Sequence, residues 1–285
     1  MSSPYFCMEA SPLPTKITPR MARNEAAARN ENDSATLQFR RERLPVGREP
    51  VRPLRHRWYR SCKHVADFTL AVLLTVPALP LILVATLLVK LTSRGPAFYS
   101  QARVGEDGRL FTIWKIRSMI HNCESLTGPR WSMPGDPRVT RVGAFLRKSH
   151  LDELPQLLNV LRGEMSLIGP RPERPEFVPE LERELPGYWQ RLLVRPGVTG
   201  LAQVQLPPDS DLVSVRNKLA HDLYYIRHLS PWLDVRLLVC TAFYALGLPF
   251  GVAGKLLGIP GHEAVERAMS DALGNMPSPR ARKIA

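Results

Sequence analysis

Two adjacent carboxylates, Asp152 and Glu153, are the residues of this chain whose types and setting best suit chemistry on a phosphate. They belong to the segment 149–156, SHLDELPQ, and the basic pair Arg147-Lys148 stands directly before it. A helix N-terminus keeps a carboxylate ionised, so that it can attack as a nucleophile. A second carboxylate beside it can hold a divalent cation such as Mg²⁺ or handle a proton. The segment therefore indicates a reaction centre for an anionic substrate.

The same segment also fits a purely structural interpretation. Ser149 and Asp152 have the spacing of a helix capping box, and acidic residues in a first turn stabilise a helix through its dipole. Pro155 is tolerated near a helix start. Taken alone, these residues favour the cap, so the chemical interpretation depends on what surrounds the pair.

Cationic side chains beside turn-forming segments could balance the charge of a phosphate. The arginine guanidinium matches phosphate oxygens in two-point contacts. Arg171 is the most informative of these cations, because Pro170 and Pro172 fix the backbone on both sides of it. A solvent-exposed cation is the competing interpretation for each. The full set is Lys115, Arg117, Arg138, Arg141, Arg147, Lys148, Arg171 and Arg195.

An uncharged apolar run of 22 residues, 68–89, precedes these motifs. A helix that spans a membrane needs about 20 apolar residues, so the length suffices. Pro77 and Pro80 lie in the middle and disfavour a straight helix. Both flanks are basic, whereas a single span has one basic side. The run therefore predicts a re-entrant helix that enters the membrane, breaks at the prolines and returns, with a plain transmembrane helix as the alternative.

The region after this run, residues 92–230, predicts a small β-hairpin followed by short helices. Strand-like segments 97–104 and 109–115 flank the turn 105–108, in which glycine supplies the bend. The fold class is therefore α+β and mainly helical. We predict helices over 139–148, from 149 or 152 to 162, and over 177–185, 188–193 and 214–228, with tight turns at 169–173 and 195–200.

The remaining segments complete a division into five parts. Residues 231–258 are apolar and contain Gly247, Pro249 and Gly251, so we favour an amphipathic helix in the headgroup plane. A second span and a buried core helix are the alternatives. The predicted parts are a basic, largely disordered tail (1–60), the membrane helix (61–91), the catalytic domain (92–230), the interfacial helix (231–258) and a polar tail (259–285).

The charge balance points to anionic partners. The chain has 39 Lys and Arg against 26 Asp and Glu, a formal charge of +13, which suits acidic lipid or phosphorylated substrates. No nucleic acid is expected as a partner, because no helix-turn-helix, zinc finger or RNA-binding motif accompanies the charge. The four cysteines are far apart, so neither a zinc site nor a disulfide framework is indicated.

Eight short motifs occur in order between about residues 60 and 245. Together they resemble the bacterial sugar transferase family, the monotopic polyprenyl-phosphate hexose-1-phosphate transferases, and this resemblance outweighs the capping-box interpretation. The motifs are Lys63…Asp67 before the proline-containing run, 101–105 (QARVG), 115–119 (KIRSM), 136–143 (DPRVTRVG), 151–156 (LDELPQ), 159–163 (NVLRG), 165–173 (MSLIGPRPE) and 195–203 (RPGVTGLAQ).

The resemblance implies a reaction and its partners. Family members transfer a hexose 1-phosphate from a UDP-sugar to undecaprenyl phosphate through a covalent aspartyl-phosphosugar intermediate, release UMP and require Mg²⁺. This step starts exopolysaccharide, O-antigen or glycoconjugate assembly. The resemblance also implies a place in the bacterial inner membrane, with the catalytic domain facing the cytoplasm. The sequence leaves the sugar and the oligomeric state open, a homo-oligomer included.

The resemblance assigns roles to residues of this chain. Asp152 is the nucleophile and Glu153 is the metal ligand or proton handler, so the pair forms the expected Mg²⁺ site. Pro77 and Pro80 break the membrane helix. The candidates for phosphate or nucleotide contacts are Lys115, Arg117, Arg147, Arg171 and Arg195.

One segment departs from the family pattern. After Gln203 the family often continues with a Ser-Gly-Arg-like turn, whereas this chain has VQLPPDSD over 204–211. This departure concerns the nucleotide or sugar end of the site. The alternative function is a membrane-tethered scaffold with an inactive transferase-like domain, and the intact Asp152, Glu153 and Arg171 argue against it.

Overall fold

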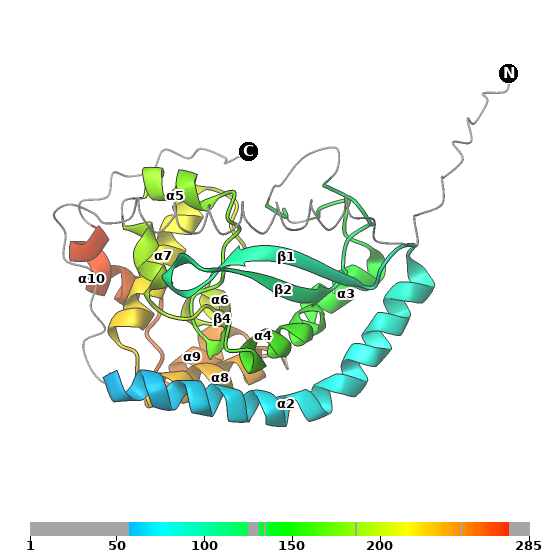
Figure 1. Cartoon of the computed structure of the whole chain (residues 1–285). Coiled ribbons are helices and arrows are strands. Elements are labelled where there is room, and N and C mark those ends of the chain that lie inside the picture. The colour runs from blue at the N-terminus through cyan, green and yellow to red at the C-terminus, as the bar shows by residue number, and fades with distance from the viewer. Residues whose placement is uncertain (1–56, 125–130, 134, 186, 246, 274–285) are drawn as a thin grey trace, which may run out of the picture. The chain divides into compact units, whose positions relative to one another are not determined.

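The structure is a computed structural model, and it describes residues 57–124, 131–133, 135–185, 187–245 and 247–273 (Figure 1). All of these residues belong to one unit, 43–285. The predicted basic tail lies outside the described residues as far as residue 56, and so do the last twelve positions, 274–285. Residues 57–60, which we placed in the tail, are instead the first turn of the membrane helix.

Helix α2 (Arg57–Thr92) is a continuous helix of 36 residues that contains the apolar run. Pro77 and Pro80 lie inside it, and the helix continues through both instead of breaking. Proline removes a backbone donor and bends a helix, and Figure 1 shows α2 running below the domain and then turning up beside α3 (Arg141–Lys148).

The segment Cys62–Thr92 is the one helix among the described residues that is long and apolar enough to cross a membrane. Only 17% of its most apolar window is buried, whereas a core helix of a soluble protein would be mostly covered. Together with the sequence motifs, this exposed apolar surface indicates a membrane-associated protein.

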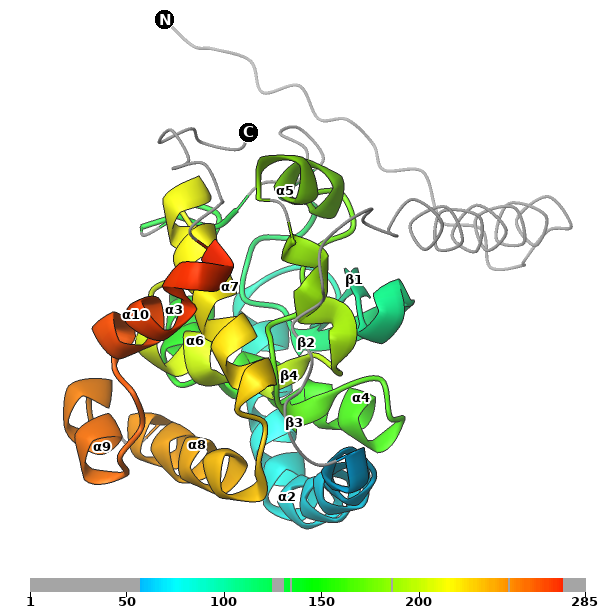
Figure 2. The same ribbon diagram turned by 90° about the vertical axis from the view of Figure 1, so that its left-hand side faces the viewer.

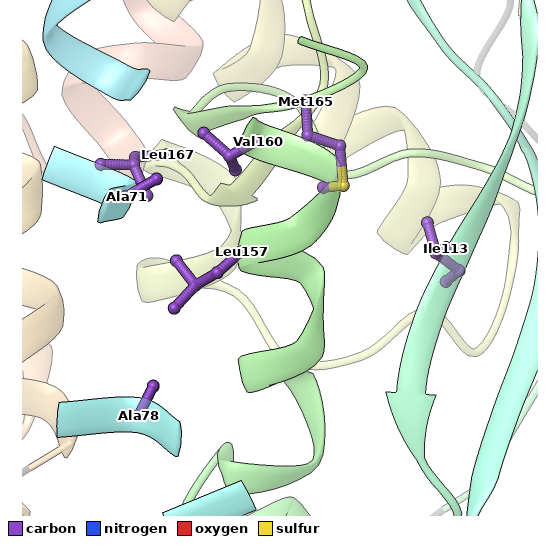
Figure 3. Close-up of a cluster of buried hydrophobic side chains, with 7 residues drawn as sticks. All are labelled: Ala71, Ala78, Ile113, Leu157, Val160, Met165 and Leu167. Atoms are coloured by element: carbon purple, nitrogen blue, oxygen red, sulfur yellow. The ribbon is translucent and has the colours of Figure 1, made fainter. Parts of the chain in front are cut away.

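The inner side of α2 carries small residues at seven-residue spacing. Ala71, Ala78 and Ala85 are buried, and short side chains let two helices approach closely. Figure 3 shows Leu157 and Val160 of α4 (Leu157–Leu161) pointing toward Ala71 and Ala78. Met165 and Ile113 close the other side of this cluster, so the cluster joins the membrane helix to the domain that carries the candidate site.

The predicted β-hairpin is confirmed. Strands β1 (Phe98–Val104) and β2 (Leu110–Ile116) pair antiparallel, with Phe98 opposite Ile116. A single 3₁₀ turn, η1 (Glu106–Gly108), joins them. Asp107 and Gly108 have φ values of 54° and 76° there, and aspartate and glycine tolerate this left-handed conformation.

The predicted tight turn at 195–200 is wrong. Residues Gly197–Thr199 form strand β4, which pairs in parallel with β3 (Ser166–Ile168). A Cβ atom on Gly197 would lie 2.1 Å from the amide nitrogen of Gly169, so glycine is required for this approach. Strands of three residues have too little hydrophobic alternation to be recognised in the sequence.

Most predicted helices are confirmed, and two of them are wholly or partly 3₁₀ helices. The order after β2 is α3, the 3₁₀ helix η2 (Leu151–Gln156), α4, β3, α5 (Val178–Glu184), the 3₁₀ helix η3 (Tyr188–Leu193), β4, α6 (Leu201–Gln205) and α7 (Leu212–Arg227). Asp211 begins α7, and its side chain accepts a hydrogen bond from the amide of Ser214. The fold is therefore mainly helical, with two small sheets among the described residues.

The apolar C-terminal stretch forms two helices, α8 (Pro231–Ala245) and α9 (Phe250–Leu256). The chain turns between them, with Gly247 at φ 89°, so the single straight second span is not formed. Helix α8 lies beside α2 in Figures 1 and 2, and Lys63 of α2 pairs with Asp234 of α8 at 2.6 Å. Trp232, Val235, Val239, Leu248, Val252 and Leu256 are exposed.

The prediction that 259–285 is only a polar tail is wrong for its first part. Residues His262–Leu273 form α10, which lies beside α7 in Figure 2. Val265 and Met269 are fully buried. Their spacing of four residues places them on one face of a helix, a short amphipathic pattern that the charged residues around it conceal.

Candidate active site

Asp152 and Glu153 lie at the start of η2, and the capping box of the competing structural interpretation does not form. Ser149 ends the preceding helix α3, and its hydroxyl donates to the carbonyl of Phe145 at 2.9 Å. His150 adopts a left-handed conformation at φ 56° and turns the chain from α3 into η2. The two carboxylates therefore follow a sharp bend between two helices that pack on each other.

Glu153 is held by two cations from distant parts of the chain. Its Oε1 accepts from Lys115 Nζ at 2.7 Å and from Arg171 Nη2 at 2.6 Å, and its Oε2 accepts from Arg171 Nη1 at 3.2 Å. Burial by itself would raise the pKa of Glu153, but Arg171 and Lys115 outweigh this effect and hold it well below its usual value. Glu153 is therefore a fixed anion.

The surroundings of Asp152 differ from those of Glu153. It is only 6% exposed, and among the described residues no group donates a hydrogen bond to its carboxylate. Burial first, and then the charge of Glu153, raise the pKa of Asp152 to about 6, against the opposing charges of Lys115, Arg147 and Arg171. The expectation that a helix N-terminus depresses this pKa is wrong, because Asp152 is buried and stands beside a second anion, Glu153.

The structure brings three of the five predicted cations to this pair. Lys115 comes from β2 and Arg171 from the segment after β3. Arg147, on the last turn of α3, donates to the hydroxyls of Ser118 and Ser132, at 2.8 Å in each case. Its charge acts on Asp152. Three separate segments of the chain thus place positive charge near the carboxylate of Asp152.

The other two predicted cations lie elsewhere. Arg117 is buried and donates to the backbone carbonyls of Arg94 at 2.5 Å and Ser93 at 3.1 Å, so it holds the end of α2. Arg195 pairs with Glu106 at 3.5 Å. It lines a hollow of about 310 Å³ near the start of α2, together with Arg60 and His64.

Three residues at the site were not among the candidates. Gln203 accepts from Arg171 Nη1 at 3.1 Å. Arg103 donates to the backbone carbonyl of Pro172, and Arg191 donates to that of Arg171. Arg103 lies in the motif 101–105 and Gln203 in the motif 195–203, so the motifs could have identified both residues. Arg191 lies outside all eight motifs, and no sequence pattern identified it.

The donor set suits a magnesium ion only when it is shared with a substrate. Among the described residues no cluster of three or more His, Cys, Asp or Glu side chains could hold a metal. Mg²⁺ is commonly bound by one or two carboxylates together with substrate phosphates and water. Asp152 has oxygens to offer, whereas both oxygens of Glu153 are engaged. Asp152 therefore fits an ion whose remaining ligands are phosphate oxygens and water, whereas Glu153 is committed to Arg171 and Lys115.

Comparison with known proteins relates this chain to one family. Residues 58–247 match the bacterial sugar transferase family. The chain is 48% identical over 173 residues to a UDP-N-acetylgalactosamine-undecaprenyl-phosphate N-acetylgalactosaminephosphotransferase of Aeromonas hydrophila, in a match covering 60% of this chain and 41% of that protein. It is 45% identical over 181 residues to a UDP-glucose:undecaprenyl-phosphate glucose-1-phosphate transferase of Caulobacter vibrioides, covering 63% and 67%.

A third relative is similar over a longer stretch. The chain is 40% identical over 210 residues to a UDP-glucose:undecaprenyl-phosphate glucose-1-phosphate transferase of Xanthomonas campestris, in a match covering 71% of this chain and 43% of that protein. The chain thus spans less than half the length of the Aeromonas and Xanthomonas relatives. The matched part includes the membrane helix, both sheets and the carboxylate pair.

Proposed function

This chain belongs to the bacterial sugar transferase family, and from that premise we propose that it transfers a hexose 1-phosphate from a UDP-sugar to undecaprenyl phosphate. The observation that carries the proposal is the difference in partners between the two adjacent carboxylates. Glu153 is neutralised by Lys115 and Arg171, while Asp152 has no hydrogen-bond donor among the described residues. The relatives act on different sugars, N-acetylgalactosamine and glucose, so the hexose is a question for experiment.

The proposed reaction has two displacements at one phosphorus atom. In the first, the carboxylate of Asp152 attacks the sugar-bearing phosphate, the bond to the bridging oxygen breaks, and UMP leaves with that oxygen. In the second, an oxygen of undecaprenyl phosphate attacks the same phosphorus and Asp152 is released as a carboxylate. A covalent intermediate lets a soluble donor and a lipid acceptor use one site in turn.

The surrounding cations supply what phosphoryl transfer needs most, which is position and balancing charge. Arg171 and Lys115 hold Glu153 in place, and Arg147 adds positive charge near Asp152. Asp152, with Glu153 beside it, would hold a bound Mg²⁺, and the ion would supply further positive charge for the phosphate oxygens. Because Lys115 and Arg171 form ion pairs with Glu153, they are not paired with Asp152.

We place the enzyme in the bacterial cytoplasmic membrane, with α2 re-entrant and the catalytic residues facing the cytoplasm. Both flanks of the apolar run are basic, two prolines lie inside it, and the helix bends (Figure 1). The exposed apolar residues of α8 and α9 suit the headgroup region. Single cysteines at positions near 58 and 95 should react with an impermeant thiol reagent from the same side, and labelling from opposite sides rules out the re-entrant path.

The activity can be tested with the full chain in lipid nanodiscs that contain undecaprenyl phosphate. A panel of UDP-sugars with Mg²⁺ is scored by UMP release and by formation of the lipid-linked sugar. In nanodiscs prepared without undecaprenyl phosphate, and with the accepted donor labelled on the sugar, the protein should retain label until the acceptor lipid is added. Asp152→Asn should abolish both turnover and retention of label.

A matched control removes one carboxylate elsewhere. Asp107 is exposed in the hairpin turn at φ 54°, a conformation that asparagine accepts, so Asp107→Asn should behave as the wild type. Full turnover by Asp152→Asn would refute the nucleophile assignment. No UMP release from any donor, with the protein folded, would favour the inactive scaffold instead.

A further inference from the structure

We propose that Arg191 is a positioning residue: held by Asp222, it fixes the backbone of Arg171 and thereby the guanidinium that clamps Glu153. This inference rests on the proposed function, because it concerns the geometry of the same reaction. It gives a role to a buried arginine that lies outside every motif of the sequence and touches neither carboxylate of the pair.

The segment that carries Arg171 is held through its carbonyl oxygens. Pro170 and Pro172 have no amide hydrogen, so this stretch has few donors of its own. The carbonyl of Pro170 accepts from the amide of Gly197 at 2.8 Å, and that of Pro172 accepts from Arg103 Nη1 at 3.0 Å. The carbonyl of Arg171 itself accepts from Arg191 Nη2 at 2.8 Å.

Each of these three carbonyls is held by a different part of the fold. Gly197 belongs to β4, Arg103 to β1 and Arg191 to η3. Only the bond from Arg191 is made to the residue whose side chain meets Glu153. Its loss would free the backbone at the one point from which the guanidinium extends.

Arg191 is itself tightly constrained. Arg191 and Asp222 are 7% and 3% exposed, and Nη2 of Arg191 lies 2.8 Å from Oδ2 of Asp222 on α7. Nη1 donates to the hydroxyl of Tyr188, whose ring lies under the same guanidinium. A buried arginine needs a counter-charge and several acceptors, and here one of those acceptors is the backbone of Arg171.

The geometry therefore forms a short chain from α7 to the reacting carboxylates. Asp222 holds Arg191, Arg191 holds the Arg171 carbonyl, and the Arg171 guanidinium holds Glu153 at 2.6 Å and 3.2 Å. A displacement of about 1 Å in catalytic groups can lower a rate about 100-fold. We expect Arg191→Met to lower kcat about 10- to 100-fold with a smaller change in KM.

A double-mutant cycle separates positioning from a general loss of structure. If Arg191 acts through Arg171, then Arg191→Met should cost little further activity once Arg171→Met is present. Multiplying effects of the two substitutions would overturn the proposal. Asp222→Asn keeps the shape of the side chain and removes its charge. It replaces Arg191→Met as the test variant if Arg191→Met does not fold. It should lower kcat in the same direction by a smaller factor.

A chemical readout tests the same point without turnover. The Arg171 side chain is 40% exposed, so phenylglyoxal can reach it, and its ion pair with Glu153 should slow the reaction. In the full chain in nanodiscs, Arg191→Met and Asp222→Asn should increase the modification rate of Arg171 several-fold, as measured by mass spectrometry. An unchanged rate in both folded variants would overturn the proposal.

Controls keep this inference separate from the proposed function. Arg183 on α5 is a surface arginine, 70% exposed in its side chain, so Arg183→Met should change neither kcat nor the reactivity of Arg171. If the wild-type chain releases no UMP from any UDP-sugar, the proposed function fails. The phenylglyoxal comparison still reports whether Arg191 fixes Arg171.

Discussion

Arg171 donates two hydrogen bonds to Glu153, from Nη2 to Oε1 at 2.6 Å and from Nη1 to Oε2 at 3.2 Å. Lys115 approaches the same carboxylate at 2.7 Å. The neighbouring residue, Asp152, is left buried without a hydrogen-bond donor among the described residues. Adjacent carboxylates in one 3₁₀ turn thus have different surroundings, because Glu153 has two cationic partners and Asp152 has none in hydrogen-bond contact among the described residues.

The first prediction concerns the pH dependence of the first displacement. Asp152 must be ionised to attack, and its pKa is raised to about 6. UMP release under kcat/KM conditions should therefore fall as the pH drops through about 6, approaching tenfold per pH unit below it. Measurements from pH 5 to pH 8.5 with the accepted donor will show this limb, and a rate that stays flat down to pH 5 contradicts it.

The second prediction concerns the stability that ionised Asp152 costs. Its pKa rises from 3.8 to about 6 on folding, so the folded state binds the proton more tightly than the unfolded chain. Stability from this group is present below about pH 4 and is lost as the pH rises through about 6. Asp152→Asn should therefore raise the free energy of unfolding by about 1–3 kcal/mol at pH 8.

This gain should shrink toward zero as the pH falls toward 4, where the wild-type carboxyl is also neutral. Thermal unfolding in nanodiscs at pH 4.5, 6 and 8 gives the comparison. Asp107→Asn, at an exposed turn, should show no such pH-dependent gain. Destabilisation of Asp152→Asn at pH 8 would mean that ionised Asp152 is favourably solvated.

The third prediction separates two arginines that look alike in the sequence. Arg117 donates to the carbonyls at the end of α2, whereas Arg171 clamps Glu153. Arg117→Met should lower the free energy of unfolding by about 1–3 kcal/mol, because the buried guanidinium no longer donates hydrogen bonds to the end of α2. It should leave KM for the UDP-sugar unchanged. Arg171→Met should mainly lower kcat. A raised KM in a stable Arg117→Met protein would show that Arg117 contributes to substrate binding after all.

The fourth prediction concerns the parallel strand pair behind Arg171. A Cβ on Gly197 would lie 2.1 Å from the amide nitrogen of Gly169 and 2.3 Å from the carbonyl oxygen of Thr199. Gly197→Ala should therefore force β3 and β4 apart and destabilise the protein by about 2–4 kcal/mol. Gly251 on α9 has nothing within 4 Å of the same position, so Gly251→Ala should be neutral or stabilising by up to about 1 kcal/mol.

Unfolding midpoints of the two glycine variants, measured side by side, test this comparison. Loss of activity in Gly197→Ala is expected to accompany its loss of stability, because β3 leads directly into Gly169 and Arg171. Equal midpoints for the two variants would show that the strand pair can relax without cost.

Local sequence patterns determined much of the frame. The uncharged run predicted α2, glycines predicted the turn of the hairpin, and the helix candidates at 139–148 and 214–228 correspond to α3 and α7. These are short-range signals, since each depends on neighbours within one or two turns or across one tight turn. The carboxylate pair was also visible in the sequence, because its two members are adjacent.

The tertiary structure alone decided which cation meets which carboxylate. Lys115 and Arg171 stand 38 and 18 positions from Glu153, Arg117 turned to the end of α2, and Arg191 reached Arg171 from a segment without a motif. The raised pKa of Asp152 likewise depends on burial that no local pattern records. Ion pairs and desolvation arise from packing between distant segments, so the sequence provided the reacting groups and the fold determined their charge and partners.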